Sequence, residues 1–169
     1  MKIQQKPNNR SAWVLLSCIV LLNCVTTEAQ TKSKYECDEP QPEPLCNAAN
    51  TCGSALSSCT IDITMSAGSA RVKPDTPSAR SDQLFCLEEG TTVVWMTSDK
   101  TTGFVVSFGP DSPFDPDDLI VGAGKKQMRT IASNPGCYKY EPRAFYSGAV
   151  YGTSKGGKPE LVVLPSRNR

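Results

Sequence analysis

The stretch Pro135-Gly136-Cys137-Tyr138-Lys139-Tyr140-Glu141 places a turn directly before strictly alternating residue types. Proline and glycine favour a turn, and successive side chains of a strand point to opposite faces. Tyr138 and Tyr140 therefore share one face, and Cys137 lies on the other. This pattern predicts a central strand of a β-fold, with both tyrosines buried and their hydroxyls bonded to backbone in the manner of a tyrosine corner.

A second stretch, residues 89–95, has the sequence Glu-Gly-Thr-Thr-Val-Val-Trp. Its glycine turn leads into β-branched residues, which favour strands, and it ends on Trp95, a side chain large enough to centre a core. We expect this strand to be the neighbour of the one at 135–141. Together the two stretches predict a β-sandwich.

Other short runs of alternating or β-branched residues predict the remaining strands. They lie at residues 60–65, 70–73, 83–87, 104–108, 119–121, 127–132, 148–151 and 161–164, with a proline-rich loop at 109–118. No segment has convincing helical periodicity. Short strands separated by turn signals are typical of an all-β, Greek-key sandwich.

Residues 1–29 have the features of a signal peptide. Lys2, Lys6 and Arg10 precede an apolar run at 12–22, which is shorter than the roughly 20 residues that a membrane-spanning helix needs. Small residues favour cleavage after Ala29, so we expect a secreted, periplasmic or cell-envelope protein. Residues 21–24, Leu-Leu-Asn-Cys, leave open a lipoprotein with its anchor at Cys24.

The rest of the chain divides by composition into a Pro/Cys-rich appendage at 30–59, a sandwich at 60–165 and a tail at 166–169. An even number of cysteines in an exported chain predicts a disulfide framework. Four cysteines inside the appendage suggest that it is stapled internally, and three internal pairings stay open. We further hypothesise an outer-face bridge between Cys86 and Cys137. The six cysteines expected in disulfides are Cys37, Cys46, Cys52, Cys59, Cys86 and Cys137.

The charge balance argues against nucleic acid and anionic membranes as partners. The chain has 18 basic and 17 acidic residues, a formal net charge of +1. Such a balance provides no electrostatic attraction to polyanions. Membrane contact is expected only through a lipid anchor at Cys24.

The order of three motifs over about residues 60–164 resembles the cupredoxin superfamily, the blue-copper sandwiches of the plastocyanin type. The motifs are the glycine turn and tryptophan strand at 90–95, the Phe-Val-Val run at 104–106, and the Gly-x-Tyr-x-Tyr strand at 136–140. The resemblance implies a cupredoxin-like Greek-key sandwich. It also implies a copper site of two His, one Cys and usually an axial Met.

This chain contains no histidine. By position, the resemblance places the family's first His near Gly103 or Phe104, its Cys near Pro142, and its later His within 143–148. We therefore expect no type-1 copper, no metal and no cofactor. The lack of imidazole also excludes Ser-His-Asp and Cys-His catalytic centres.

Two groups of side chains offer weaker metal-binding hypotheses. The carboxylates in the proline-rich loop could bind Ca²⁺, although their spacing differs from an EF-hand and a solvated loop is the simpler interpretation. Thioethers could bind Cu(I), but we expect Met65 and Met96 to fill gaps in the core. The residues concerned are Asp111, Asp115, Asp117 and Asp118, and Met65, Met96 and Met128.

Arg143, Phe145 and Tyr146 follow the tyrosine strand, in a segment predicted to be a loop at the former metal end of the resemblance. Aromatic and arginine side chains on loops suit partner recognition. We predict a non-enzymatic binding or structural module whose partner is a protein or a glycan. The alternatives are a copper-handling or electron-transfer protein with unusual ligands, and a hydrolase or other enzyme that uses carboxylates.

Overall fold

The computed structural model describes residues 37, 39, 41–114, 119–153 and 157–166. The predicted signal peptide and Cys24 lie outside these residues, as does most of the acidic loop. Among the described residues, no helix has the length and apolarity that a membrane crossing requires.

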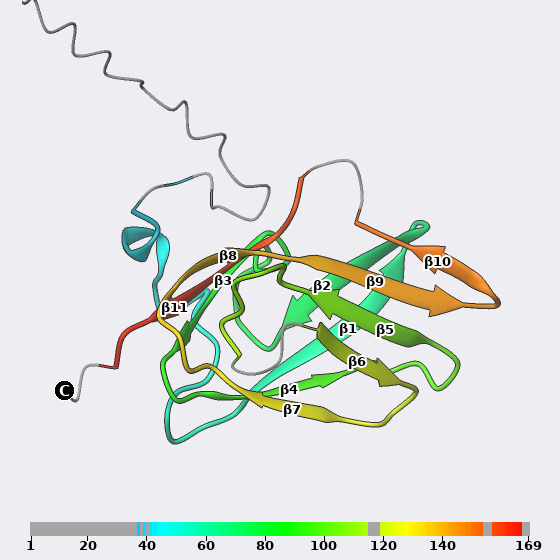
Figure 1. The fold of residues 1–169 in the computed structure, drawn as a ribbon, viewed down its shortest axis with the longest axis horizontal. Coiled ribbons are helices and arrows are strands. Elements are labelled where there is room, and N and C mark those ends of the chain that lie inside the picture. The colour runs from blue at the N-terminus through cyan, green and yellow to red at the C-terminus, as the bar shows by residue number, and fades with distance from the viewer. Residues whose placement is uncertain (1–36, 38, 40, 115–118, 154–156, 167–169) are drawn as a thin grey trace, which may run out of the picture. The chain divides into compact units, whose positions relative to one another are not determined.

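The described residues form an all-β structure apart from one short 3₁₀ helix, as predicted. The elements are η1 Glu43–Leu45, β1 Cys59–Ser66, β2 Ser69–Pro74, β3 Leu84–Glu88, β4 Thr92–Met96, β5 Gly103–Ser107, β6 Leu119–Ala123, β7 Met128–Ile131, β8 Gly136–Lys139, β9 Glu141–Tyr146, β10 Ala149–Tyr151 and β11 Glu160–Leu164 (Figure 1).

One layer of the sandwich is a sheet in the order β2-β1-β4-β7. Strand β1 pairs antiparallel with β2 and parallel with β4. The alternating residues 60–65 therefore form a strand with a neighbour on each side, and Ile61 and Ile63 are fully buried. We expected the strand at 89–95 to be the neighbour of the tyrosine strand. The two are not paired, because β4 pairs with β1 and β7.

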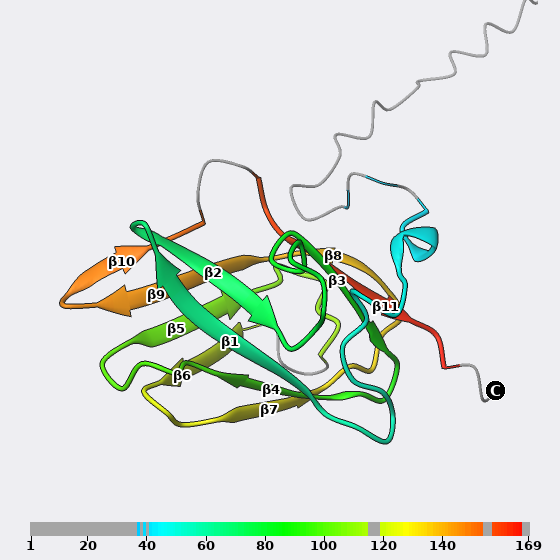
Figure 2. The same cartoon turned by 180° about the vertical axis from the view of Figure 1, so that it is seen from behind.

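The other layer consists of two sheets, β3-β11-β8 and β10-β9-β5-β6. Strands β8 and β9 form one extended run that is interrupted at Tyr140, so the run pairs first with β11 and then with β5. Figures 1 and 2 show this run from both sides, with the β9–β10 hairpin at the end remote from η1. The predicted loop after Glu141 is thus a strand. Its interior positions Pro142 and Ala144 are buried, which favours continued pairing over a loop.

The two layers bury a single aromatic-rich core. Trp95 is fully buried, and its indole Nε1 donates a hydrogen bond of 2.9 Å to the Thr130 hydroxyl, which satisfies its one polar atom. Its ring packs edge-on against Phe114 at 5.7 Å, and Phe108 packs against Tyr140 at 5.3 Å. These rings hold the layers together through apolar burial and edge-to-face contact.

The methionine prediction is wrong for two residues. Met65 and Met96 are half-buried, and neither belongs to the core cluster, whereas Met128 packs against it. Met96 is paired with Asp62 across β1 and β4, so it shares the polar outer face of that sheet. Position on the strand, rather than residue type, explains the difference.

Of the eight cysteines in the chain, the six that were expected to form disulfides do so, but their pairing differs from the prediction. Cys37 is bonded to Cys137, Cys46 to Cys86, and Cys52 to Cys59. Only the last bridge lies within the Pro/Cys-rich segment. The other two attach this segment to β8 and β3.

The hypothesis of a Cys86–Cys137 bridge is wrong because a strand separates the two residues. Val162 of β11 is paired with Cys86 on one side and with Cys137 on the other. Two strand spacings amount to about 9.5 Å, beyond the roughly 7 Å between Cα atoms that a disulfide can bridge. Each bonds instead to a cysteine of the Pro/Cys-rich stretch, Cys37 or Cys46. We call the described residues of this stretch before β1 the N-terminal segment.

The N-terminal segment covers the outer face of β3-β11-β8. Cys86 and Val162 point to that face, yet both are at most 1% exposed. The Cys52 amide donates to the Cys86 carbonyl, and the Cys86 amide donates to the Asn50 carbonyl, so the segment extends the sheet beyond β3. Backbone pairing and two disulfides therefore make it part of the fold.

The two tyrosines of the central strand differ: Tyr140 is fully buried, as predicted, whereas Tyr138 is only half-buried. The Tyr138 hydroxyl donates to the Asn134 carbonyl at 3.0 Å, as expected for a tyrosine corner. The Tyr140 hydroxyl is fully buried and has no hydrogen-bond partner among the described residues, contrary to the prediction. Burial, with a smaller effect from the Asp82 charge, raises the pKa of Tyr140 well above its usual 10.0.

This difference predicts opposite effects of two matched substitutions. Tyr138→Phe should lower the free energy of unfolding by about 1 kcal/mol, because it removes a hydrogen bond. Tyr140→Phe should leave it unchanged or raise it by up to about 1 kcal/mol, because it removes a buried unpaired hydroxyl. Urea unfolding followed by tryptophan fluorescence measures both, and a larger loss for Tyr140→Phe would contradict the assignment.

The disulfides should contribute in the order of the loops that they close. Cys46 and Cys86 lie 40 residues apart, and Cys52 and Cys59 lie 7 apart. In the chain-entropy model, replacing both cysteines by Ala costs about 4 kcal/mol for the first pair and about 2 kcal/mol for the second. Unfolding without reductant tests this order, and non-reducing peptide mapping tests the pairing itself. Equal losses would show that chain entropy does not dominate.

Candidate functional site

The outer face of the β10-β9-β5-β6 sheet is apolar and exposed. Strand register places its side chains on one surface, because Val150 is paired with Phe145, and Val105 with Val121. We call this surface the apolar face. Its members are Val105, half-buried, and Leu119, Val121, Phe145 and Val150, which are 52%, 49%, 38% and 58% exposed.

Arg143 lies within the apolar face, paired across the strands with Val105. Its guanidinium is 3.4 Å from the Glu141 carboxylate, which also forms an ion pair with Lys158 Nζ at 2.6 Å. Arg143 and Phe145, two of the three predicted partner-binding residues, therefore share one surface. The third, Tyr146, is 40% exposed but belongs to the opposite side of β9 by alternation.

Most of this face was missed by the sequence analysis. The available signal was the Phe-Val-Val run of β5, since apolar residues on both sides of a strand indicate that both faces are suited to burial. Phe104 points inward and is fully buried against Gly122, where an added Cβ would lie 2.4 Å from its ring. Val105 points outward to the apolar face.

The outer face of the other layer is polar in comparison. Asp62 is paired with Lys73, and Thr64 with Arg71, on the outward side of β1 and β2. Ile131 at the end of β7 is an isolated exposed hydrophobic residue there. The concentration of apolar side chains is therefore specific to one side of the sandwich, and contiguous exposed apolar surface commonly marks an interaction site.

A groove of about 520 Å³ lies where β2 meets the starts of β3 and β11. Its charges are balanced: Arg71 is 3.9 Å from Asp82, and the lining also holds one further cation, Lys158, and one further carboxylate, Glu160. Such a lining offers hydrogen bonds without a strong net field, which suits a neutral polar molecule such as a glycan. Its lining is Ala70, Arg71, Val72, Asp82, Gln83, Leu84, Pro142, Thr153, Gly157, Lys158, Pro159 and Glu160.

The positions that the family resemblance assigned to copper ligands come together on β5 and β9. Phe104 is paired with Ala144, and Val106 with Pro142, on the inner face. Phe104 and Pro142 are buried. These side chains carry no nitrogen or sulfur donor, so imidazole and thiolate coordination has no basis at these positions.

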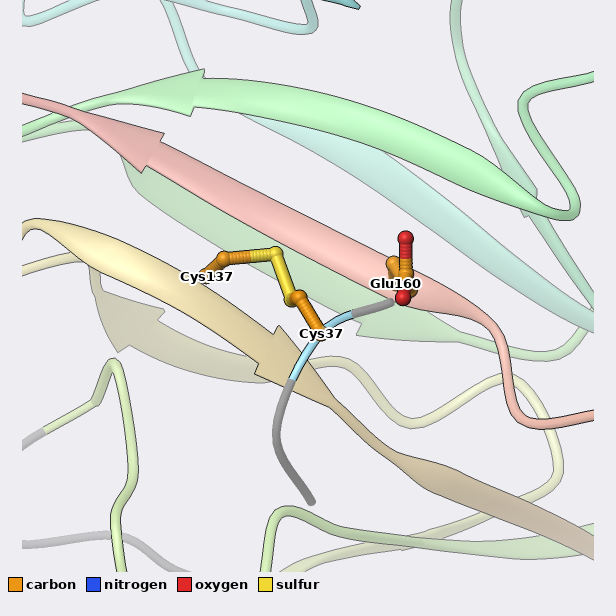
Figure 3. A group of neighbouring side chains, drawn as sticks. All are labelled: Cys37, Cys137 and Glu160. Atoms are coloured by element: carbon orange, nitrogen blue, oxygen red, sulfur yellow. A yellow bond between two sulfur atoms is a disulfide. The ribbon is translucent and has the colours of Figure 1, made fainter. Parts of the chain in front are cut away.

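A different cluster of potential ligand atoms lies on the outer face of β8 and β11. The sulfurs of Cys37 and Cys137 and a carboxylate oxygen of Glu160 are all within 4.8 Å of one another. Figure 3 shows Cys137 on β8, Glu160 on β11, and Cys37 reaching them from the N-terminal segment. The predicted calcium loop lies outside the described residues at Asp115, Asp117 and Asp118.

Comparison with known proteins gives structural similarity only. No family model and no curated protein matches the chain. An oxidised amicyanin variant is 14% identical, with 68% of this chain and 93% of that chain covered at a TM-score of 0.36. A reduced auracyanin from Roseiflexus castenholzii is 14% identical, covering 70% and 100% at 0.32, and a multicopper oxidase from Campylobacter jejuni is 13% identical, covering 66% and 26% at 0.34. Values this low do not place the chain in a family.

Proposed function

We propose that this protein is an exported, copper-free binding module that recognises a protein partner through the apolar face. The observation that carries the proposal is the contiguous apolar surface across four strands, with Arg143 at its centre. Aromatic and arginine side chains surrounded by aliphatic residues are typical of the centres of protein interfaces. The three disulfides are consistent with an oxidising compartment.

Binding rather than catalysis is the function that the charged groups support. Glu141 is engaged by both Arg143 and Lys158, and Asp82 faces Arg71. An ion pair occupies the carboxylate oxygens that a general acid or base would have to present to a substrate. We therefore favour ligand binding over acid-base chemistry for this protein, and an enzyme stays the weaker alternative.

The apolar face generates a prediction for partner affinity. Phe145→Ser combined with Val121→Ser should weaken partner binding at least about tenfold, because loss of an interface anchor commonly costs more than 1.4 kcal/mol. Both side chains are partly exposed, so the fold should survive. The measurement is quantitative co-purification from a cell-envelope extract of the native producer, with wild type and variant as parallel baits.

Ile131→Ser is the matched control, because Ile131 is 58% exposed but lies on the other layer. It should bind as the wild type does. Equal recovery of the same partner by wild type, control and double variant would contradict the proposal. If Arg71→Ala in the groove abolishes recovery of a glycan while the double variant does not, the glycan alternative replaces it.

Metal analysis tests the copper-free part of the proposal. Protein incubated with Cu²⁺ and then exchanged into metal-free buffer should retain far less than one copper per chain and show no visible absorption. The reason is that Phe104 and Pro142, which have no donor atom for copper in their side chains, stand near the positions where the family resemblance places a histidine and a cysteine ligand. One bound copper with a visible band would instead favour the electron-transfer alternative.

A further inference from the structure

The outer face of β8 and β11 holds three ligand atoms of the kinds that bind zinc. Cys137 is paired with Val162, and Glu160 with Lys139, so Cys137 and Glu160 are diagonal neighbours on one face of an antiparallel pair. Cys37 completes the group through its disulfide to Cys137. The sheet itself therefore fixes two of the three positions.

We propose that reduction of the Cys37–Cys137 disulfide converts this cluster into a site for Zn²⁺ or a similar borderline-soft divalent cation. The ligands would be two thiolates and the Glu160 carboxylate, with water in the fourth position. This set matches the three-protein-ligand arrangement of open zinc sites, whose ligands include Cys and Asp or Glu. The site would exist only in the reduced protein.

The conversion balances through a dithiol as reductant. Two electrons and two protons pass from the dithiol to the bridge, giving two thiols, while the sulfurs of the dithiol form their own disulfide. Metal binding then releases the two thiol protons to solvent, because the thiolate is the ligand. Glu160 enters as a carboxylate and transfers no proton.

The distances require only local movement. In a tetrahedral zinc site the two sulfurs lie about 3.8 Å apart, and each lies about 3.6 Å from the carboxylate oxygen. The three donor atoms here already lie within 4.8 Å of one another, so opening the bridge has only to separate the sulfurs. Cys137 and Glu160 keep their sheet positions, and Cys37 adjusts.

The surroundings distinguish this disulfide from the other two. Glu160 is 13% exposed in its side chain, which limits competition from solvent. Lys139 Nζ lies 3.9 Å from Glu160 and must yield the carboxylate to the metal. Among the described residues, neither Cys46–Cys86 nor Cys52–Cys59 has a carboxylate that completes such a group.

Cadmium titration of the purified protein tests the proposal, because cadmium–thiolate bonds absorb in the ultraviolet. A phosphine replaces the dithiol as reductant, since dithiols bind the metal themselves; the phosphine becomes its oxide with an oxygen from water. We expect one Cd²⁺ per reduced chain and none in the oxidised chain. Tryptophan fluorescence follows the fold throughout.

Three variants locate the site. Cys37→Ser with Cys137→Ser should abolish binding, and Glu160→Gln should weaken it at least about tenfold, the loss that even outer-shell partners of a metal cause. Cys52→Ser with Cys59→Ser is the matched control and should bind one Cd²⁺ as the parent does. Binding that survives loss of Cys37 and Cys137, unchanged affinity in Glu160→Gln, no binding by the reduced parent, or unfolding on reduction would each overturn the proposal.

Discussion

One extended run of chain, from Gly136 to Tyr146, belongs to both sheets of the second layer, and the rest of the fold depends on its passage between them. The transition occurs at Tyr140, whose amide donates to the Pro159 carbonyl and whose ring packs against Phe108 and Phe85. This anchoring directs the first half of the run to β11 and the second half to β5. The disulfide-covered face and the apolar face are consequently two parts of one continuous layer.

The two outer surfaces of that layer differ in the exposure of their apolar residues, which are buried on one surface and exposed on the other. Over β3-β11-β8 the N-terminal segment buries Val162, and disulfides hold the segment in place. Over β10-β9-β5-β6 no described segment covers Val121 and Val150. The first surface is thus completed within the chain, whereas the second retains the composition of an interface.

The sequence was sufficient to predict most strands but not their neighbours. Alternation determines the face of a residue, so the opposite orientations of Tyr138 and Cys137 could be predicted. Alternation contains no information on which strands are neighbours. It therefore predicts a bridge between Cys86 and Cys137, which the intervening strand β11 rules out. Register also decided the candidate site: Phe145 was identifiable as an aromatic, but its proximity to Val150 and the β5–β6 pair depends on long-range pairing. The unpaired hydroxyl of Tyr140 depends on packing and has no sequence signal.

The Cys37–Cys137 bridge also determines how mechanical load enters the fold. A pulling force on the chain ahead of Cys37 passes through a covalent bond directly into β8, which pairs along its length with β11. The hydrogen bonds that hold residues 50–52 against β3 are bypassed and do not have to resist it. Reduction of this single bridge would transfer the load to the Cys46–Cys86 attachment, so the redox state of one disulfide sets the point at which the sandwich is held.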